Sequence, residues 1–161
     1  MLEDACVELL AEDSRQALTR IDLFWGRLAM HIRAEHLHLF PALLGAAEEK
    51  DAVNATGVKN TIGQLRADHN FFMSELAAVI KTMRELEKSD ADEPPHLGEV
   101  KERIENIHRR LITHNDIEES RIYPLADVLL STDEAVKISL KMKIELDNLP
   151  PRFINDTEAA R

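Results

Sequence analysis

Two histidine–glutamate pairs are the residues of this sequence whose types and spacing best suit chemistry. His31 precedes Glu35 by four residues, and His114 precedes Glu118 by the same interval. Residues four apart project from one face of a helix, about one turn from each other. An imidazole and a carboxylate placed in this way can both reach a metal ion, and the carboxylate can extend inward to bridge two ions. The spacing is therefore typical of metal coordination.

The sequences around the two pairs are also alike. HIRAEHLHLFP (31–41) matches HNDIEESRIYP (114–124) at an offset of 83 residues, with His, Glu and Pro in the same places. The repeat also aligns Phe40 with Tyr123. An internal repeat of this kind predicts a pseudo-two-fold site between two pairs of helices.

Both pairs, together with a further histidine, interrupt stripes of apolar residues where Leu or Ile would be expected. An ionised carboxylate buried in such a stripe costs several kcal/mol unless it is paired, protonated or bound to a cation. Three imidazoles and two carboxylates on the core stripes of three helices suggest one shared partner, and a metal is the simplest. The candidate metal ligands are His31, Glu35, His69, His114 and Glu118.

Imidazole and carboxylate ligands suit iron, manganese or zinc, and no thiolate belongs to the constellation. Di-iron sites in helical bundles use this mixture of ligands, so iron is the expected metal, with manganese and zinc as alternatives. The single cysteine, Cys6, is expected to act as a small apolar residue because no basic residue lies beside it.

Other polar residues near the motifs receive weaker assignments. His38 is a possible accessory ligand or a support for the ligands, and otherwise a half-buried neighbour. Tyr123 and Phe40 are expected to pack the helix ends rather than to take part in redox chemistry. Glu119 is expected at the surface, with an alternative role as a ligand. Exposure to solvent is expected for three further histidines, His36, His96 and His108.

Helical periodicity identifies the elements that must position these residues. Apolar residues recur at steps of three and four over many turns, which predicts an all-α, antiparallel up-and-down bundle. The expected helices are a short one at 2–12, then 14–47, 58–88 and 98–130, and an extra C-terminal one at 131–149. Ser131 and Glu134 form a capping-box pattern that opens the last helix. A single domain is expected over 1–149, followed by a polar tail at 150–161.

The doubled H-x-x-x-E-x-x-x-[FY]-P motif, with His69 between its copies, resembles the hemerythrin-like (HHE) domain family over about residues 14–130. The resemblance implies a four-helix bundle with a non-haem di-iron centre. It implies His31, His69 and His114 as terminal ligands and both glutamates as bridges. The family pattern has a further histidine on the first helix, which this sequence lacks, so its first helix is expected to be truncated. Met73 stands where oxygen carriers can have a second histidine.

Composition narrows the classes of partner. The formal net charge of −10 disfavours binding to nucleic acid and to membrane surfaces. No apolar run is long enough to span a bilayer, and the N-terminus lacks the basic region of a secretory signal, so a cytoplasmic protein is expected. The truncated first helix should leave an apolar groove, which predicts a homodimer.

Three functions remain open at this stage. The first is a non-haem di-iron protein that senses or handles oxygen, nitric oxide or iron, with a small diatomic ligand as its partner and no catalytic residues beyond the metal ligands. The second is a bundle that has lost its metal and acts in interaction or regulation. The third is a di-iron protein of the cluster-repair type. Whether the protein is an enzyme is left undecided, with a non-enzymatic role favoured.

Overall fold

The computed structural model describes residues 14–50, 55–86 and 97–150. Every regular element in these ranges is helical, and the expected all-α bundle is confirmed. The elements are α2 (Ser14–Ala34), η1 (Glu35–Leu39), α3 (Phe40–Lys50), α4 (Ala55–Leu86), α5 (Leu97–Ile117), η2 (Glu118–Ile122), α6 (Tyr123–Leu129) and α7 (Thr132–Asp147). The expected helix at 2–12 and the tail at 151–161 lie outside the described residues.

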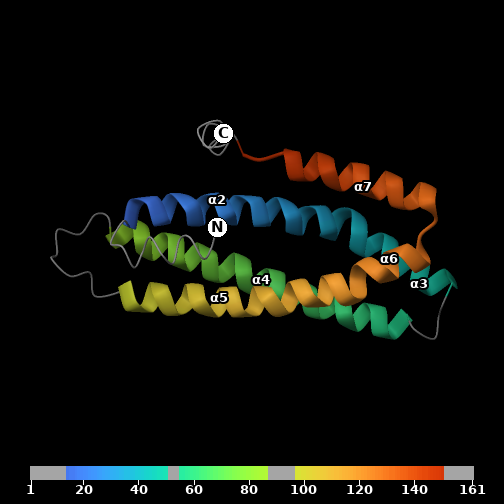
Figure 1. The fold of residues 1–161 in the computed structure, drawn as a ribbon, viewed down its shortest axis with the longest axis horizontal. Helices are drawn as coiled ribbons and strands as arrows, with labels where there is room; N and C mark the ends of the chain where they lie inside the picture. The colour runs from blue at the N-terminus through green and yellow to red at the C-terminus, as the bar shows by residue number, and fades with distance from the viewer. Residues whose placement is uncertain (1–13, 51–54, 87–96, 151–161) are drawn as a thin grey trace.

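The described part of the bundle consists of four long helical segments, here called rods. One rod is the continuous helix α2–η1–α3, the second is α4, the third is the continuous helix α5–η2–α6, and the fourth is α7. The rods alternate in direction, and α2, α4 and α5 lie side by side along the long axis of the molecule (Figure 1). The fourth rod, α7, packs on α2 and η1. None of the described helices is both long and apolar enough to cross a membrane.

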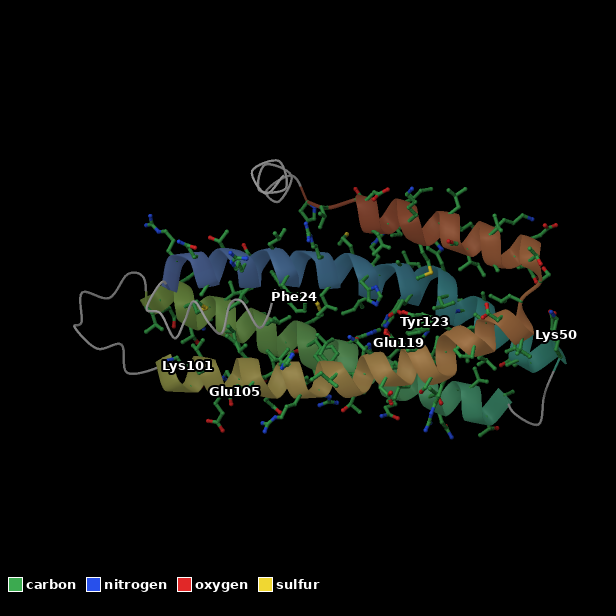
Figure 2. All side chains as sticks on the ribbon, viewed as in Figure 1. Phe24, Lys50, Lys101, Glu105, Glu119 and Tyr123 are labelled. Carbon is green, nitrogen blue, oxygen red and sulfur yellow. The ribbon has the colours of Figure 1, made fainter. Side chains whose placement is uncertain are left out.

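The helix boundaries follow local signals. Ser131 is the N-cap of α7, where its hydroxyl accepts from the backbone N–H of Glu134 and the Glu134 carboxylate accepts from the backbone N–H of Ser131. This confirms the capping box, which satisfies two backbone groups that a helix start leaves unpaired. At the same end of the bundle Lys50 Nζ donates to the Leu129 carbonyl at 2.6 Å (Figure 2).

Each motif helix contains one turn of π-helix, which the sequence analysis did not predict. The turns start at Glu35 and Glu118, and the backbone N–H groups of Phe40 and Tyr123 donate to those carbonyls five residues back. A proline follows each turn. Because proline lacks the N–H for a helical bond and its ring crowds the carbonyl four residues earlier, the helix widens just before it.

The π turn corrects one part of the predicted stripe. The expected face continued from Glu35 through His38 and Ala42, but the buried positions beyond Glu35 in this rod are Leu39, Phe40, Leu43 and Ala47. A π turn contains one residue more than an α turn, and this residue rotates the following segment relative to α2. The prediction failed because it assumed an uninterrupted α-helical period.

Two apolar clusters make up the core. The first packs α2, the second half of α4, and α5, and is built on residues such as Ile21, Leu76 and Ile104. The second packs α3, the first half of α4, and α6, and includes Leu43 and Ile62. A buried polar layer separates the clusters, because Asp68 and His69 interrupt the apolar positions of α4 between them.

Candidate metal centre

The five predicted ligands meet in this polar layer from three rods. His31 comes from the last turn of α2, His69 from the middle of α4 and His114 from the last turn of α5. Glu35 and Glu118 each begin a π turn, in agreement with the repeat. Four of the five side chains are at least 96% buried, while His31 keeps 33% of its side chain exposed.

One group of ligand atoms surrounds the imidazoles of His69 and His114. Their Nε2 atoms lie 3.1 Å apart. Glu118 Oε1 lies 2.8 Å from His114 Nε2 and 4.0 Å from His69 Nε2. Glu35 Oε2 lies 3.3 Å from His69 Nε2. Two imidazoles and one oxygen from each carboxylate therefore converge on one small volume.

A second group surrounds His31. Its Nε2 atom lies 3.4 Å from Glu35 Oε1 and 3.9 Å from Glu118 Oε2. Each carboxylate therefore turns one oxygen toward His31 and the other toward His69 or His114. The ligand atoms within each of the sets His69–His114–Glu118 and His31–Glu35–Glu118 lie within 4.8 Å of one another. Such an arrangement can hold two cations bridged by two carboxylates, with fewer protein ligands on the His31 side.

The carboxylate oxygens themselves favour a cation at this position. Both oxygens of Glu35 and Oε1 of Glu118 are buried without a hydrogen-bond partner among the described residues. They lie close to imidazole nitrogens but outside hydrogen-bond geometry. Buried polar atoms without partners are costly. A cation placed between these three carboxylate oxygens and the imidazole lone pairs would give each oxygen a partner. The residues present therefore fit a metal ion.

Two polar neighbours orient the imidazoles from outside. Asp68 Oδ2 lies 3.4 Å from His114 Nδ1, while Arg110 holds the other carboxylate oxygen at 2.7 Å. His36 Nε2 and His69 Nδ1 share a hydrogen bond of 2.9 Å. With hydrogen on Nδ1, each imidazole presents its Nε2 lone pair to the centre, as metal-ligating histidines do when a partner holds their other nitrogen.

Asp68 was not predicted from the sequence to take part in the site, and the prediction that His36 is solvated was wrong, because His36 is half-buried. His36 was placed off the stripe by α-helical counting, but the π turn that contains it changes the direction of its side chain. The position of Asp68 next to His69 was the only sequence signal for its role. Its partners, Arg110 and His114, lie 42 and 46 residues further along the chain.

The pKa values of the two carboxylates in the centre shift in opposite directions. Burial raises the pKa of Glu35. Burial also acts on Glu118, but the attraction of the adjacent His114 and His31 imidazoles outweighs it and lowers the pKa of Glu118 to about 2. Burial and the neighbouring His114 lower the pKa of His69 to about 3, so its imidazole is neutral at neutral pH. The adjacent carboxylates of Glu118 and Glu35 raise the pKa of His31 to about 10.

Other predicted residues lie outside the cluster. His38 points to α7, with its Nε2 atom 3.6 Å from Glu145. Glu119 is exposed, and Phe40 is fully buried, with its ring stacked on His69 at 5.9 Å. Tyr123 does more than pack a helix end, because its hydroxyl donates to Glu118 Oε2 at 3.4 Å. His108 is half-buried rather than exposed, and His96 lies outside the described residues.

The fold and this cluster define a class, a helical bundle with a cation site built between its rods. Comparison with known families agrees, because the family model described as hemerythrin HHE cation-binding domain matches residues 1–126. The chain therefore belongs to the hemerythrin HHE cation-binding family, as its motifs predicted. No curated protein gives a significant match. No solved structure gives one either.

Proposed function

We infer that this protein binds two iron ions between α2, α4 and α5 and uses them to sense or handle oxygen, nitric oxide or iron. The proposal rests on the orientation of the two carboxylates. Glu35 and Glu118 each turn one oxygen toward His31 and the other toward His69 or His114. Bridging carboxylates with terminal imidazoles are the ligand set of di-iron centres in helical bundles. Membership of a cation-binding family supports the same conclusion.

The chain's own residues would make the two metal positions unequal. His69 and His114 are buried and supported by His36 and Asp68, so they would define an enclosed position. His31 is one-third exposed, and the position beside it would have fewer protein ligands. Bound iron would supply affinity for a small diatomic ligand at a coordination position that the protein leaves open. The exposed edge of His31 marks the side from which such a ligand would enter.

Metal analysis of the purified protein tests this proposal. We expect about two iron ions per chain after loading with ferrous iron and removal of excess, because the ligands form two overlapping sets that share Glu118. Glu118→Gln should reduce loading to one ion or none, because Glu118 belongs to both sets. Glu119→Gln is the matched control, since this neighbouring carboxylate is exposed and its loading should equal that of the wild type.

Less than about one ion per wild-type chain under these conditions would overturn the proposal and favour a bundle that has lost its metal. Equal loading of Glu118→Gln and Glu119→Gln would show that iron binds elsewhere. Parallel loading with manganese and zinc identifies the preferred metal, because all three accept imidazole and carboxylate ligands.

A further inference from the structure

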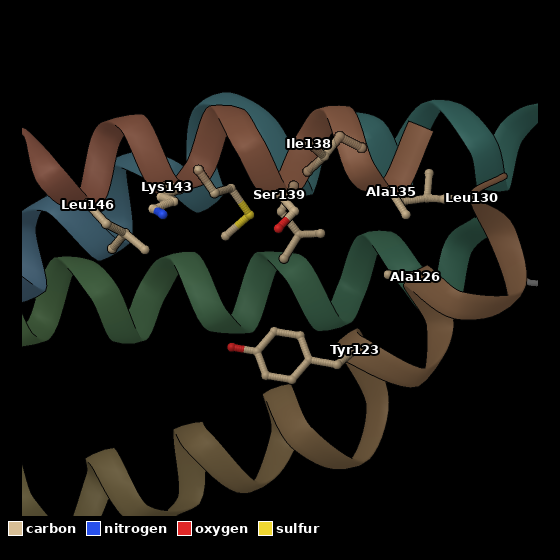
Figure 3. A pocket seen from close by; sticks show the side chains of 10 residues that line it. Tyr123, Ala126, Leu130, Ala135, Ile138, Ser139, Lys143 and Leu146 are labelled. Atoms are coloured by element: carbon tan, nitrogen blue, oxygen red, sulfur yellow. The ribbon is translucent and has the colours of Figure 1, made fainter. Parts of the chain in front are cut away.

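A cavity of about 320 Å³, open to solvent on one side, lies between α7 and the α6 end of the bundle (Figure 3). Its α7 wall carries Ile138, Met142 and Leu146, and Tyr123 faces them from the opposite side. Leu39 of η1 adds a further apolar side chain. The volume lies at the lower end of the ~300–1,000 Å³ that small-molecule sites occupy.

Most of the residues that line this cavity lie beyond the region matched by the family model. The family match ends at residue 126, whereas α7 spans Thr132–Asp147. No residue of α7 is fully buried, and Ile138 and Met142 are only half-buried although they face the bundle. A helix that merely completed the core would bury this face, as α4 does. The apolar face of α7 therefore lines a cavity as well as packing on α2.

The cavity is lined by few polar side chains, one of them positively charged and the others neutral hydroxyl groups. Among the described residues, Lys143 is the only charged one that lines it, in a protein with a formal net charge of −10. The hydroxyl groups of Ser139 and Tyr123 are the other polar side-chain groups in its lining. No carboxylate from the described residues lines it, although Glu118 lies behind the Tyr123 hydroxyl. An apolar wall with one cation at its edge complements a molecule with a hydrocarbon body and one negative charge.

We propose that this cavity binds an aliphatic monocarboxylate of medium chain length. Its hydrocarbon chain lies against Ile138, Met142 and Leu146, and its carboxylate pairs with Lys143. The binding does not require iron, so its failure and the failure of the di-iron proposal are separate results. Through Tyr123 the cavity adjoins a ligand of the metal centre, which places the carboxylate-binding site next to the position where metal chemistry is proposed.

Calorimetric titration of the metal-free protein with decanoate tests the proposal, and decanol serves as the neutral ligand of equal chain length. We expect saturable binding of one decanoate per chain below its micelle concentration, and weaker binding of decanol. Lys143→Gln should weaken decanoate binding by about tenfold and leave decanol unchanged, because only the ionised ligand loses a partner. Lys141→Gln is the matched control, since this exposed lysine of α7 does not line the cavity.

A second variant locates the ligand. Ser139→Trp places a large side chain into the cavity from its exposed rim and should abolish binding of both ligands, with helix content checked by circular dichroism. Ile144→Gln changes the outward face of α7 and should leave binding unchanged. The proposal is overturned if wild-type protein does not bind decanoate saturably or binds decanol as tightly. Retained binding in a folded Ser139→Trp, or lost binding in Ile144→Gln, would also overturn it.

Discussion

Glu35 is a costly residue to place in the core, because its carboxyl group is buried away from water. It is fully buried, and neither carboxylate oxygen has a hydrogen-bond partner among the described residues. Burial raises the pKa of this group, which shows that its charged form is disfavoured where it stands. A residue that lowers stability in this way is expected to be kept for its function. The geometry that Glu35 shares with Glu118 indicates that this function is to bind a metal ion.

Replacing Glu35 should therefore affect stability in opposite directions in the metal-free and the iron-loaded protein. Glu35→Leu should stabilise the metal-free protein by about 1–4 kcal/mol, because an apolar side chain of similar size replaces a buried charge. The same change should remove the rise in Tm that iron loading gives the wild type, because a bridging ligand is lost. Thermal unfolding of both proteins, with and without iron, measures the two effects.

Glu119→Leu is the control for this experiment, since its exposed carboxylate should change neither the metal-free Tm nor the effect of iron. A Glu35→Leu protein that still gains the full wild-type stabilisation from iron would remove Glu35 from the ligand set.

The π turns show how an element adapts to a site. Both start at a glutamate of the candidate metal centre and both precede a proline, so the two halves of the repeat share backbone geometry as well as residues. The widened turn in the first motif places Leu39 and Phe40 in the core and directs His38 to α7. Single π turns inside α-helices occur often at functional sites. Here they allow the apolar packing to resume after a polar layer.

The attachment of α7 should depend on pH. Glu145 accepts from Arg33 Nε at 2.7 Å and lies 3.6 Å from His38 Nε2, and the Arg33 hydrogen bond lowers the pKa of Glu145. A carboxylate with a lowered pKa in the folded state stabilises that state above its unfolded pKa, near 4, and loses this contribution as the pH falls through its folded pKa. We therefore expect amide exchange in α7 to become faster relative to α4 in that acid range.

Glu145→Gln should remove most of this relative acceleration, because its amide does not titrate. Lys81 and Glu85 offer a matched control on α4, because they form an exposed ion pair within that helix. If Glu145→Gln and the wild type show the same acid response in α7, the attachment depends on other groups.

The outer face of the molecule supports the expectation of a homodimer, which stays a prediction. The predicted groove depended on a short helix at residues 2–12, which lie outside the described residues. What the structure adds is an apolar stripe on α7, where Val136, Leu140 and Ile144 are each at least 60% exposed. Residues four apart on one helix face form a continuous surface, and a two-fold axis would bring the same stripe of a second copy against it.

Light scattering at low micromolar concentration measures the oligomeric state. We expect twice the chain mass of 18.3 kDa for the wild type and the monomer mass for Leu140→Glu, because a buried charge would oppose a stable interface of about 1,000 Å² or more. Lys141→Glu changes the same helix beside the stripe and should remain dimeric. A wild-type monomer that loads two iron ions would contradict the prediction.

Much of the protein was predictable because its signals are local. Helical periods, the Ser131 capping box and the four-residue spacing of His31 and Glu35 depend on residues within a turn or two of each other. The repeat then related two such local motifs and predicted that their ligands meet. For these features the chemistry of a short segment determines the geometry.

Contacts between distant residues were decided by the tertiary structure. His36 reaches His69 across 33 positions, Asp68 reaches His114 across 46, and Glu145 reaches Arg33 across 112. The cavity between α7 and Tyr123 likewise depends on how two rods pack. The sequence by itself determined the helices and the type of ligands, because both follow from neighbouring residues. Only packing, which fixes rotations and separations of whole helices, decided the partners of those ligands and the space beside them.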